Sequence, residues 1–272
     1  MRLLLFVTTH MSASHLSYMS KCWPVATNNS KLLREADVLL YITCNSRPTP
    51  ALLETAFPHA NGLRKVRVAQ HANPGKQAGA MLAVAEAVRK GWFTGYDWVI
   101  RLNPDVIVRD EVPLLKALRA ADSSEWHADA ILVDCRQECN FSRRPFGRPL
   151  TDFFAMRPRA GAAFPTEYER CLKLNATLNA SRESLMSGKS ASYFYCNAER
   201  SARRAFADVL NASRYQLLEE SGPAHLGSCK VVGRPVIHHH EYLKHCDGAQ
   251  ARTWGPPPSY LSDSCMHSRG GE

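Results

Sequence analysis

The chain has 272 residues, which suits one large α/β domain or at most two small ones. Its net charge of +9 is compatible with an anionic partner, such as a phosphate-bearing substrate, an acidic surface or a nucleic acid. No apolar run approaches the ~20 residues of a membrane span. The nine cysteines include no CxxC pair of the kind found in zinc ribbons. Neither a membrane span nor a zinc ribbon is therefore expected.

Strand and helix patterns alternate through the first part of the chain. Apolar, β-branched runs predict strands at residues 2–10, 37–44, 65–72, 98–102, 106–108, 129–135 and 151–158. Apolar residues spaced three or four apart predict helices at residues 14–23, 30–36, 50–57, 111–121 and within 73–92. Strands that alternate with crossover helices imply an α/β fold with a mainly parallel central sheet and helices on both faces.

The later part of the chain is less regular. Residues 164–187 show helical stretches that Asn-x-Ser/Thr sequons interrupt. Residues 197–210 predict one amphipathic helix, which Asn197 can cap. Residues 230–243 predict a short strand that ends in three histidines, and the tail after Gly248 has no regular pattern.

Sequons and cysteines bear on the compartment. Chance would give roughly one or two sequons, whereas five start at Asn28, Asn140, Asn175, Asn179 and Asn211. The run Leu3–Val7 has one basic residue before it and no small-residue cleavage site after it, which favours a buried strand over a signal peptide. A cytoplasmic protein is expected if the chain is complete, and an ER or Golgi lumen if it is a fragment.

The segment Gly95–Asp110 carries the sharpest functional signal. A buried strand ends in Asn103-Pro104-Asp105, and a second apolar run follows at once. Ligands of open parallel sheets bind beyond the carboxyl ends of the strands. A carboxylate there, two residues after an amide oxygen, suits a hard cation such as Mn²⁺ or Mg²⁺. The alternative is a plain Asn-Pro-Asp turn.

Tyr96–Val108, "YDWVIRLNPDVIV", resembles the DxD-type segment of GT-A-fold glycosyltransferases. The resemblance implies that Asp105 binds Mn²⁺ or Mg²⁺ on the diphosphate of a sugar nucleotide. Asn103 stands where that pattern has its first Asp, which leaves one negative charge fewer. The resemblance also implies a single GT-A-like, Rossmann-like domain over residues 1–272. Its expected parts are a nucleotide-sugar-binding half (1–135), an acceptor and catalytic half (136–248) and an irregular tail (249–272).

The resemblance also implies roles for other residues. The nucleotide sugar would contact Thr8, Thr9, His10, Lys76, Gln77, Arg101, Asn103 and Asp105. Besides Asp105 and Asn103, a late histidine, His238 or His240, would hold the metal. Glu199 would be the base that takes the acceptor's proton, with Asp152 as a second base or acceptor-binding carboxylate.

Structural readings of the same residues remain open. The strand-end residues and the first helical turns can be ordinary solvated features, and Glu199 can serve only the helix dipole. Arg101 needs an anionic partner, which can be a sugar nucleotide, Asp134 or another internal carboxylate. The histidines could instead bind zinc with Cys246 or with the Cys135/Cys139 pair.

The expected activity is transfer of a hexose or pentose from a nucleoside diphosphate sugar, with a UDP-sugar favoured, to a glycan or other hydroxyl acceptor. A nucleotidyltransferase of similar fold is one rival, but it should carry a glycine-rich loop after the first strand, and Thr8–Leu16 contains no glycine. A nucleic-acid-binding domain is the other rival. It should cluster basic and aromatic residues, which are dispersed here, so no nucleic-acid partner is expected.

Overall fold

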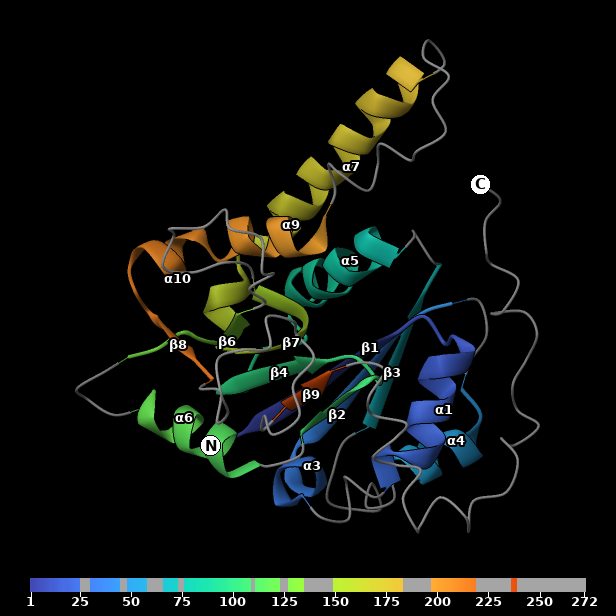
Figure 1. Ribbon diagram of the computed structural model, residues 1–272, viewed down its shortest axis with the longest axis vertical. Helices are drawn as coiled ribbons and strands as arrows, with labels where there is room; N and C mark the ends of the chain where they lie inside the picture. Colours follow the sequence, from blue (N-terminus) through green and yellow to red (C-terminus); the bar gives the residue numbers. More distant parts are fainter. Residues whose placement is uncertain are drawn as a thin grey trace, which may run out of the picture.

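A seven-stranded sheet forms the centre of the computed structural model (Figure 1). The structure describes residues 1–24, 30–44, 48–57, 66–72, 76–108, 111–122, 127–134, 149–182, 197–218 and 236–238. The sheet has the order β3-β2-β1-β4-β7-β6-β8. Its strands are β1 (Leu3–Thr9), β2 (Asp37–Thr43), β3 (Val66–His71), β4 (Trp98–Leu102), β6 (Ala130–Asp134), β7 (Pro149–Met156) and β8 (Tyr215–Leu217).

Most neighbouring strands run in parallel. β1 pairs in parallel with β2 and β4, β2 with β3, and β6 with β8, whereas β7 is antiparallel to both β4 and β6. A separate two-stranded ribbon pairs β5 (Val106–Val108) with β9 (Val236–His238). The predicted mainly parallel sheet is therefore confirmed, with β7 as its one antiparallel member among the described strands.

Helices cover both faces of the sheet (Figure 1). One face carries α1 (Ala13–Lys21), α3 (Lys31–Glu35), α4 (Pro50–Ala56) and α6 (Glu111–Ala120). The other carries α5 (Lys76–Arg89), the 3-10 turn η1 (Pro158–Gly161), α7 (Phe164–Arg182), α9 (Ala198–Ala205) and α10 (Ala207–Asn211). None of the described helices is both long and apolar enough to cross a membrane.

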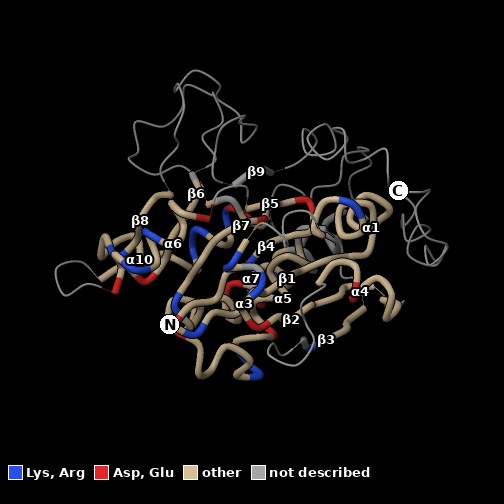
Figure 2. The backbone as a smooth tube through the Cα atoms, turned by 90° about the horizontal axis from the view of Figure 1, so that it is seen from below, with Lys and Arg blue, Asp and Glu red and all other residues tan. Residues whose placement is uncertain are grey.

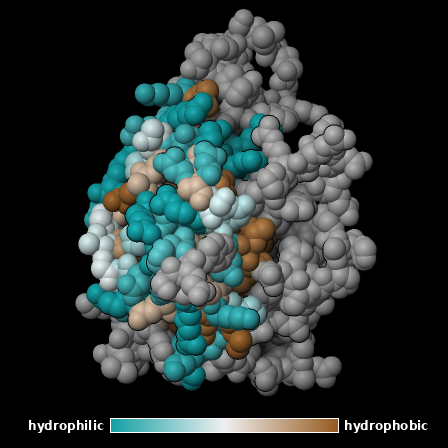
Figure 3. Space-filling view, turned by 90° about the vertical axis from the view of Figure 1, so that its left-hand side faces the viewer, coloured by the Kyte–Doolittle hydropathy of each residue, from teal (hydrophilic) through white to brown (hydrophobic). Residues whose placement is uncertain are grey.

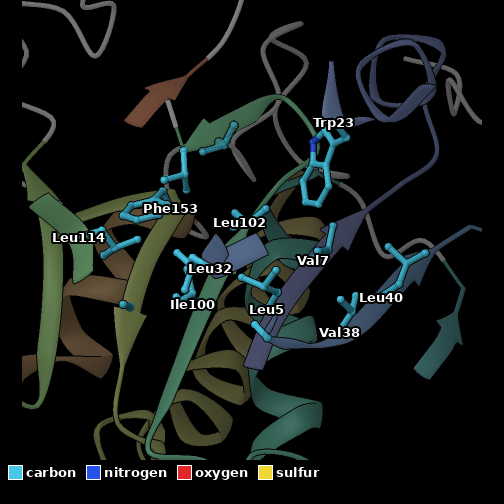
Figure 4. Packing of buried hydrophobic residues seen from close by; sticks show 14 of the residues in the cluster. Leu5, Val7, Trp23, Leu32, Val38, Leu40, Ile100, Leu102, Leu114 and Phe153 are labelled. Carbon is cyan, nitrogen blue, oxygen red and sulfur yellow. The ribbon is translucent and has the colours of Figure 1, made fainter. Parts of the chain in front are cut away.

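Alternating side chains of the central strands build the two cores. Successive residues of a strand point to opposite faces. Leu5 and Val7 of β1 join one buried cluster, which Figure 4 shows from close by, and Leu4 and Phe6 join the other. Because both faces are covered, β1 and β2 read as nearly continuous apolar runs rather than as alternating ones.

Two predicted helices differ in detail from the structure. α7 runs unbroken from Phe164 to Arg182 through two sequons, because asparagine costs a helix only a fraction of a kcal/mol and its first half packs against α5 through Phe164 and Tyr168. The single helix predicted at 197–210 is divided at Phe206, whose ring is buried against Phe154 and Phe164. The predicted cap is present, since the Asn197 side chain accepts a hydrogen bond from the Arg200 N–H.

Candidate functional site

The Asn103-Pro104-Asp105 segment forms a β-turn at the carboxyl end of β4. The Val106 N–H donates to the Asn103 carbonyl at 3.0 Å, and Pro104 takes the second position of the turn, which favours proline. The Trp23 indole N–H, from the end of α1, donates to the Pro104 carbonyl at 2.9 Å. The turn is thus fixed from two sides, and it holds the Asp105 carboxylate in a position that is only 8% exposed.

This turn lies where the order of the sheet reverses direction. β1 pairs with β2 on one side and with β4 on the other, so the carboxyl ends of β1 and β4 are neighbours. A crevice at such a switch point is the usual ligand site of an open α/β sheet. The residues at the two strand ends are Thr8 and Thr9 on β1 and Asn103 and Asp105 after β4.

Arg101 lies directly beneath the turn and is 1% exposed. Its Nη2 donates to Thr8 Oγ1 at 3.0 Å and to Asn103 Oδ1 at 3.1 Å, and its Nη1 lies 3.9 Å from Asp152 Oδ1. Burial lowers the pKa of the Arg101 guanidinium, whereas the negative charges of Asp152, Asp105 and Glu199 raise it. Its Nε and Nη1 have no hydrogen-bond partner in the described part of the chain.

The Asn103 side-chain oxygen is fully engaged within the protein. Its Oδ1 accepts from Thr8 Oγ1 at 2.7 Å as well as from Arg101, and its Nδ2 donates to Asp152 Oδ1 at 2.6 Å. The Asn103 N–H also donates to the Asp152 carbonyl at 3.1 Å. An amide oxygen has two lone pairs, and both are used here, so Asn103 Oδ1 has none left for a metal. The Asn103 Nδ2 donation orients Asp152.

Asp105 is the predicted ligand of a divalent cation. A carboxylate at a strand end suits Mn²⁺ or Mg²⁺, and Asp105 meets that need. Among the residues that the structure describes, however, no group of three or more His, Cys, Asp and Glu side chains is arranged to hold a metal. The chemistry of Asp105 therefore suits a divalent cation. Its predicted partner Asn103, as placed here, does not suit one.

Two side chains of α1, His15 and Tyr18, interact with the Asp105 carboxylate and were not predicted from the sequence. His15 Nε2 lies 3.8 Å from Asp105 Oδ1, and His15 Nδ1 is hydrogen-bonded to Thr9 Oγ1 at 2.9 Å. The His10 ring packs against that of His15 with centroids 4.3 Å apart. Burial, and then the Asp105 charge, raise the pKa of Tyr18. The rule that placed Thr9 and His10 at the site could have extended to His15, which sits in the first turn of the helix that follows.

The predicted base approaches the same edge from a distant part of the chain. Glu199 lies in the first turn of α9, and its Oε1 accepts a hydrogen bond from Thr151 Oγ1 at 3.4 Å. Thr151 precedes Asp152, whose side chain is 26% exposed. Asp152 lies 3.9 Å from Arg101, and the charges of Asp152, Asp105 and Glu199 all raise the pKa of Arg101.

Other predicted residues are placed by their backbone alone. In the ribbon of β5 and β9, the backbone of His238 pairs with Val106, and Val106 directly follows Asp105 in the chain. Lys76 and Gln77 begin α5 and Asp134 ends β6. His240 lies outside the described residues, as do Cys246 and the Cys135/Cys139 pair.

A cavity of about 660 Å³ lies elsewhere, at the amino edge of the sheet. Lys31, Asp37, Tyr96 and Arg119 are among the residues that line it. This cavity does not coincide with the residues described above. The carboxyl edge is the better candidate site because ligands of such sheets bind there, and because two nitrogens of buried Arg101 have no hydrogen-bond partner in the described part of the chain.

The chain was compared with known proteins. No family model matches it, and no curated protein matches it. Among solved structures it is similar to TarS of S. aureus at 15% identity and a TM-score of 0.45, over 82% of this chain and 59% of TarS. A protein of Desulfovibrio desulfuricans G20, named for nucleotide-diphospho-sugar transfer, is similar at 11% identity and a TM-score of 0.41, over 80% of each chain.

The mannosyltransferase PcManGT of Pyrobaculum calidifontis, solved with GDP-Man and Mn²⁺, is similar at 11% identity and a TM-score of 0.41, over 78% of this chain and 74% of PcManGT. The likeness to these three solved structures is one of fold.

Proposed function

We propose that the protein is a glycosyltransferase that moves a sugar from a nucleoside diphosphate sugar to a hydroxyl group of a glycan or other acceptor. One observation carries the proposal: at the switch point of the sheet, buried Arg101 lies 3.9 Å from Asp152, and the charges of Asp105 and Glu199 also act on it. A buried charged group with a perturbed pKa at such an edge is typical of a catalytic site.

The donor side is assigned to residues 1–135. Asp105 would hold a divalent ion, Mn²⁺ or Mg²⁺, with His238 as the second predicted ligand because its backbone lies beside Asp105. Such an ion, when bound, supplies positive charge that neutralises the departing diphosphate. The donor would reach Asp105 across the ends of β1 and β4, past His10 and the start of α5, where Lys76 and Gln77 would contact it.

The hydroxyls of Thr8 and Thr9 are engaged inside the protein, as are the Asn103 amide and Arg101. These four side chains would therefore act chiefly by fixing the geometry of the site. Arg101 and Asn103 orient Asp152, and Thr9 orients His15, which in turn lies against Asp105. Side chains locked in this way position a site before the substrate arrives, and no reorganisation is needed during the reaction.

The acceptor side is assigned to residues 136–248. The acceptor hydroxyl oxygen attacks the anomeric carbon as the bond from that carbon to the diphosphate breaks. Glu199 would act as the base that takes the hydroxyl proton. Asp152 lies nearer Arg101 and Asn103, and it would bind a second hydroxyl of the acceptor or serve as the base in place of Glu199.

Donor binding is the first experiment. Thermal unfolding is followed with UDP-, GDP- and CMP-sugars, each with and without Mn²⁺, and UDP-sugars are expected to raise the Tm most. A ligand at one hundred times its Kd stabilises the folded state by about 2.7 kcal/mol. Asp105→Asn should remove the Mn²⁺-dependent rise, and Asp208→Asn, an acidic position in the first turn of α10, serves as the matched control.

If no sugar nucleotide changes the Tm of the wild-type protein, the proposal is wrong. Stabilisation by DNA or RNA instead, weakening steeply with salt, would favour the nucleic-acid-binding rival. Figure 2 shows acidic and basic residues interspersed along the described backbone, which is not the arrangement that this rival predicts.

A further inference from the structure

The sequon Asn211-Ala212-Ser213 lies at the end of α10. Of the other four sequons, those at Asn28 and Asn140 lie outside the described residues, and those at Asn175 and Asn179 lie within the continuous helix α7. The Asn211 sequon is the one whose backbone leaves its helix at the asparagine itself. It is therefore the sequon that the described structure presents as a surface turn.

The turn at this sequon is well defined. The Ser213 N–H donates to the Leu210 carbonyl at 3.2 Å and the Arg214 N–H to the Val209 carbonyl at 2.9 Å, and Ser213 has a φ of 52°. A residue with positive φ is a common way to end a helix. Residues 211–214 are all exposed, so the side-chain amide nitrogen of Asn211 is accessible from solvent.

The sequon faces away from the candidate site. The Asp129 N–H donates to the Arg214 carbonyl at 2.7 Å, and Tyr215 pairs with Ala130, the first residue of β6. Asn211 thus lies near the amino edge of the sheet, opposite the edge that carries Asp105. Figure 3 looks at the side of the molecule where α10, β8 and α6 lie, and its described surface is mostly hydrophilic. A large polar group can project there without covering the candidate site.

Disulfide bonds provide independent support. Cys22, Cys44 and Cys171 are disulfide-bonded, and all three are buried. Disulfides persist in oxidising compartments and are rare in the cytosol, where thiols are kept reduced. Proteins that form disulfides in the ER are also exposed to the machinery that modifies Asn-x-Ser/Thr sequons. The disulfides and the exposed sequon therefore indicate the same compartment.

We infer that Asn211 is an N-glycosylation site. In the modification, Asn211 Nδ2 forms a bond to the anomeric carbon of an oligosaccharide carried on a lipid diphosphate. The bond from that carbon to the diphosphate oxygen breaks, the lipid diphosphate leaves, and Nδ2 loses one proton. Ser213 supplies the hydroxyl that the sequon requires.

The test uses the protein isolated from the cells that make it. Peptide N-glycosidase in ¹⁸O-labelled water converts a glycosylated asparagine to aspartate carrying the label, and mass spectrometry then reads the Asn211 peptide. Labelled aspartate at position 211 is expected. An unmodified Asn211 peptide as the main species would overturn the inference.

Variants expressed through a eukaryotic secretory pathway separate the sequon from its surroundings. Asn211→Gln and Ser213→Ala should each lose the glycan at this position, whereas Ala212→Ser, in the same turn, should keep it. Retention of the glycan by Ser213→Ala would contradict the assignment. Asn211→Gln should leave sugar transfer unchanged because the site lies at the opposite edge, and its Tm shows directly whether the variant folds. Since the glycan is read by mass, this result does not depend on the proposed activity.

Discussion

Two buried charged side chains, Asp129 and Arg101, lie at opposite edges of the same sheet and differ in how completely they are paired. At the amino edge Asp129 is 1% exposed. Its Oδ1 accepts from Arg159 Nε at 2.7 Å, its Oδ2 lies 3.1 Å from Arg214 Nη1, and Arg157 Nε lies 4.0 Å from Oδ1. At the carboxyl edge Arg101 is equally buried, yet its Nε and Nη1 have no hydrogen-bond partner in the described structure.

We propose that the difference separates a structural charge cluster, around Asp129, from a functional one, around Arg101. The arginines around Asp129 reach solvent with part of their side chains, so the buried carboxylate is paired while its partners stay hydrated. Arg101 has no such route, and a buried polar group without a partner costs about 1–3 kcal/mol. Folded proteins retain such a cost mainly at sites that act on a ligand. Substitutions in the Asp129 cluster should therefore change stability, and substitutions in the Arg101 cluster should change activity.

Asp105→Asn should have the largest effect. It keeps the shape of the turn and removes the negative charge that would hold the metal. The rate of sugar transfer should fall about a thousandfold, the upper range for loss of one preorganised electrostatic group, or about 4 kcal/mol of activation free energy. Initial rates and the Tm are measured together. An unchanged rate would show that the Arg101 cluster is structural as well.

Glu199→Gln should follow, with a rate about a hundredfold lower, because general-base catalysis contributes at least that factor. The variant keeps the size of the side chain and its contact distance to Thr151. Asp208→Asn, in the first turn of α10, removes a comparable helix-end charge away from the site and is the control. Equal rates for the Glu199 variant and this control would transfer the role of base to Asp152.

Asp129→Asn should lower stability and leave the transfer rate unchanged. Losing the carboxylate that joins three arginines should lower the free energy of unfolding by about 2 kcal/mol, near the value for a hydrogen bond to a charged group, because the arginines can turn to water. Urea denaturation measures the loss. The transfer rate at a temperature well below the Tm should match the wild type, and a large loss of rate in a folded protein would erase the distinction between the two clusters.

His15→Gln should have the smallest of these effects, with a rate about tenfold lower, which corresponds to about 1.4 kcal/mol. The imidazole is hydrogen-bonded to Thr9 and lies 3.8 Å from the Asp105 carboxylate, so its loss removes a neighbour of Asp105 without removing the Asp105 charge. The exposed His127 at the amino edge provides the matched control, as His127→Gln. Identical rates for the two variants would show that His15 does not position Asp105.

Most of the fold could be predicted from the sequence because both faces of the sheet are covered. β1, β2 and β4 are mostly apolar, and the helices between them carry apolar residues at helical spacing. The continuous α7 was not predictable in this way. Its sequon asparagines suggest interruptions, and it is the contact of Phe164 and Tyr168 with the α5 side of the core that holds its first half in place.

The position of the site was predictable, but its internal pairing was not. Strand ends alone placed Thr8, Asn103 and Asp105 at one edge. The engagement of Asn103 depends on Asp152, which arrives through the antiparallel pairing of β7 with β4, and a single strand does not reveal that pairing. His15 was missed for a related reason: it stands beside the apolar stripe of its helix, and only the packed structure shows that it faces Asp105.

A crystal structure of the protein with an intact UDP-sugar and Mn²⁺ tests the central claim most directly. The account predicts that the diphosphate and one metal ion lie at the carboxyl edge, with Asp105 among the metal ligands and the sugar facing Glu199. A donor bound instead in the amino-edge cavity beside Lys31 and Arg119, or a carboxyl edge without donor at saturating concentration, would contradict it.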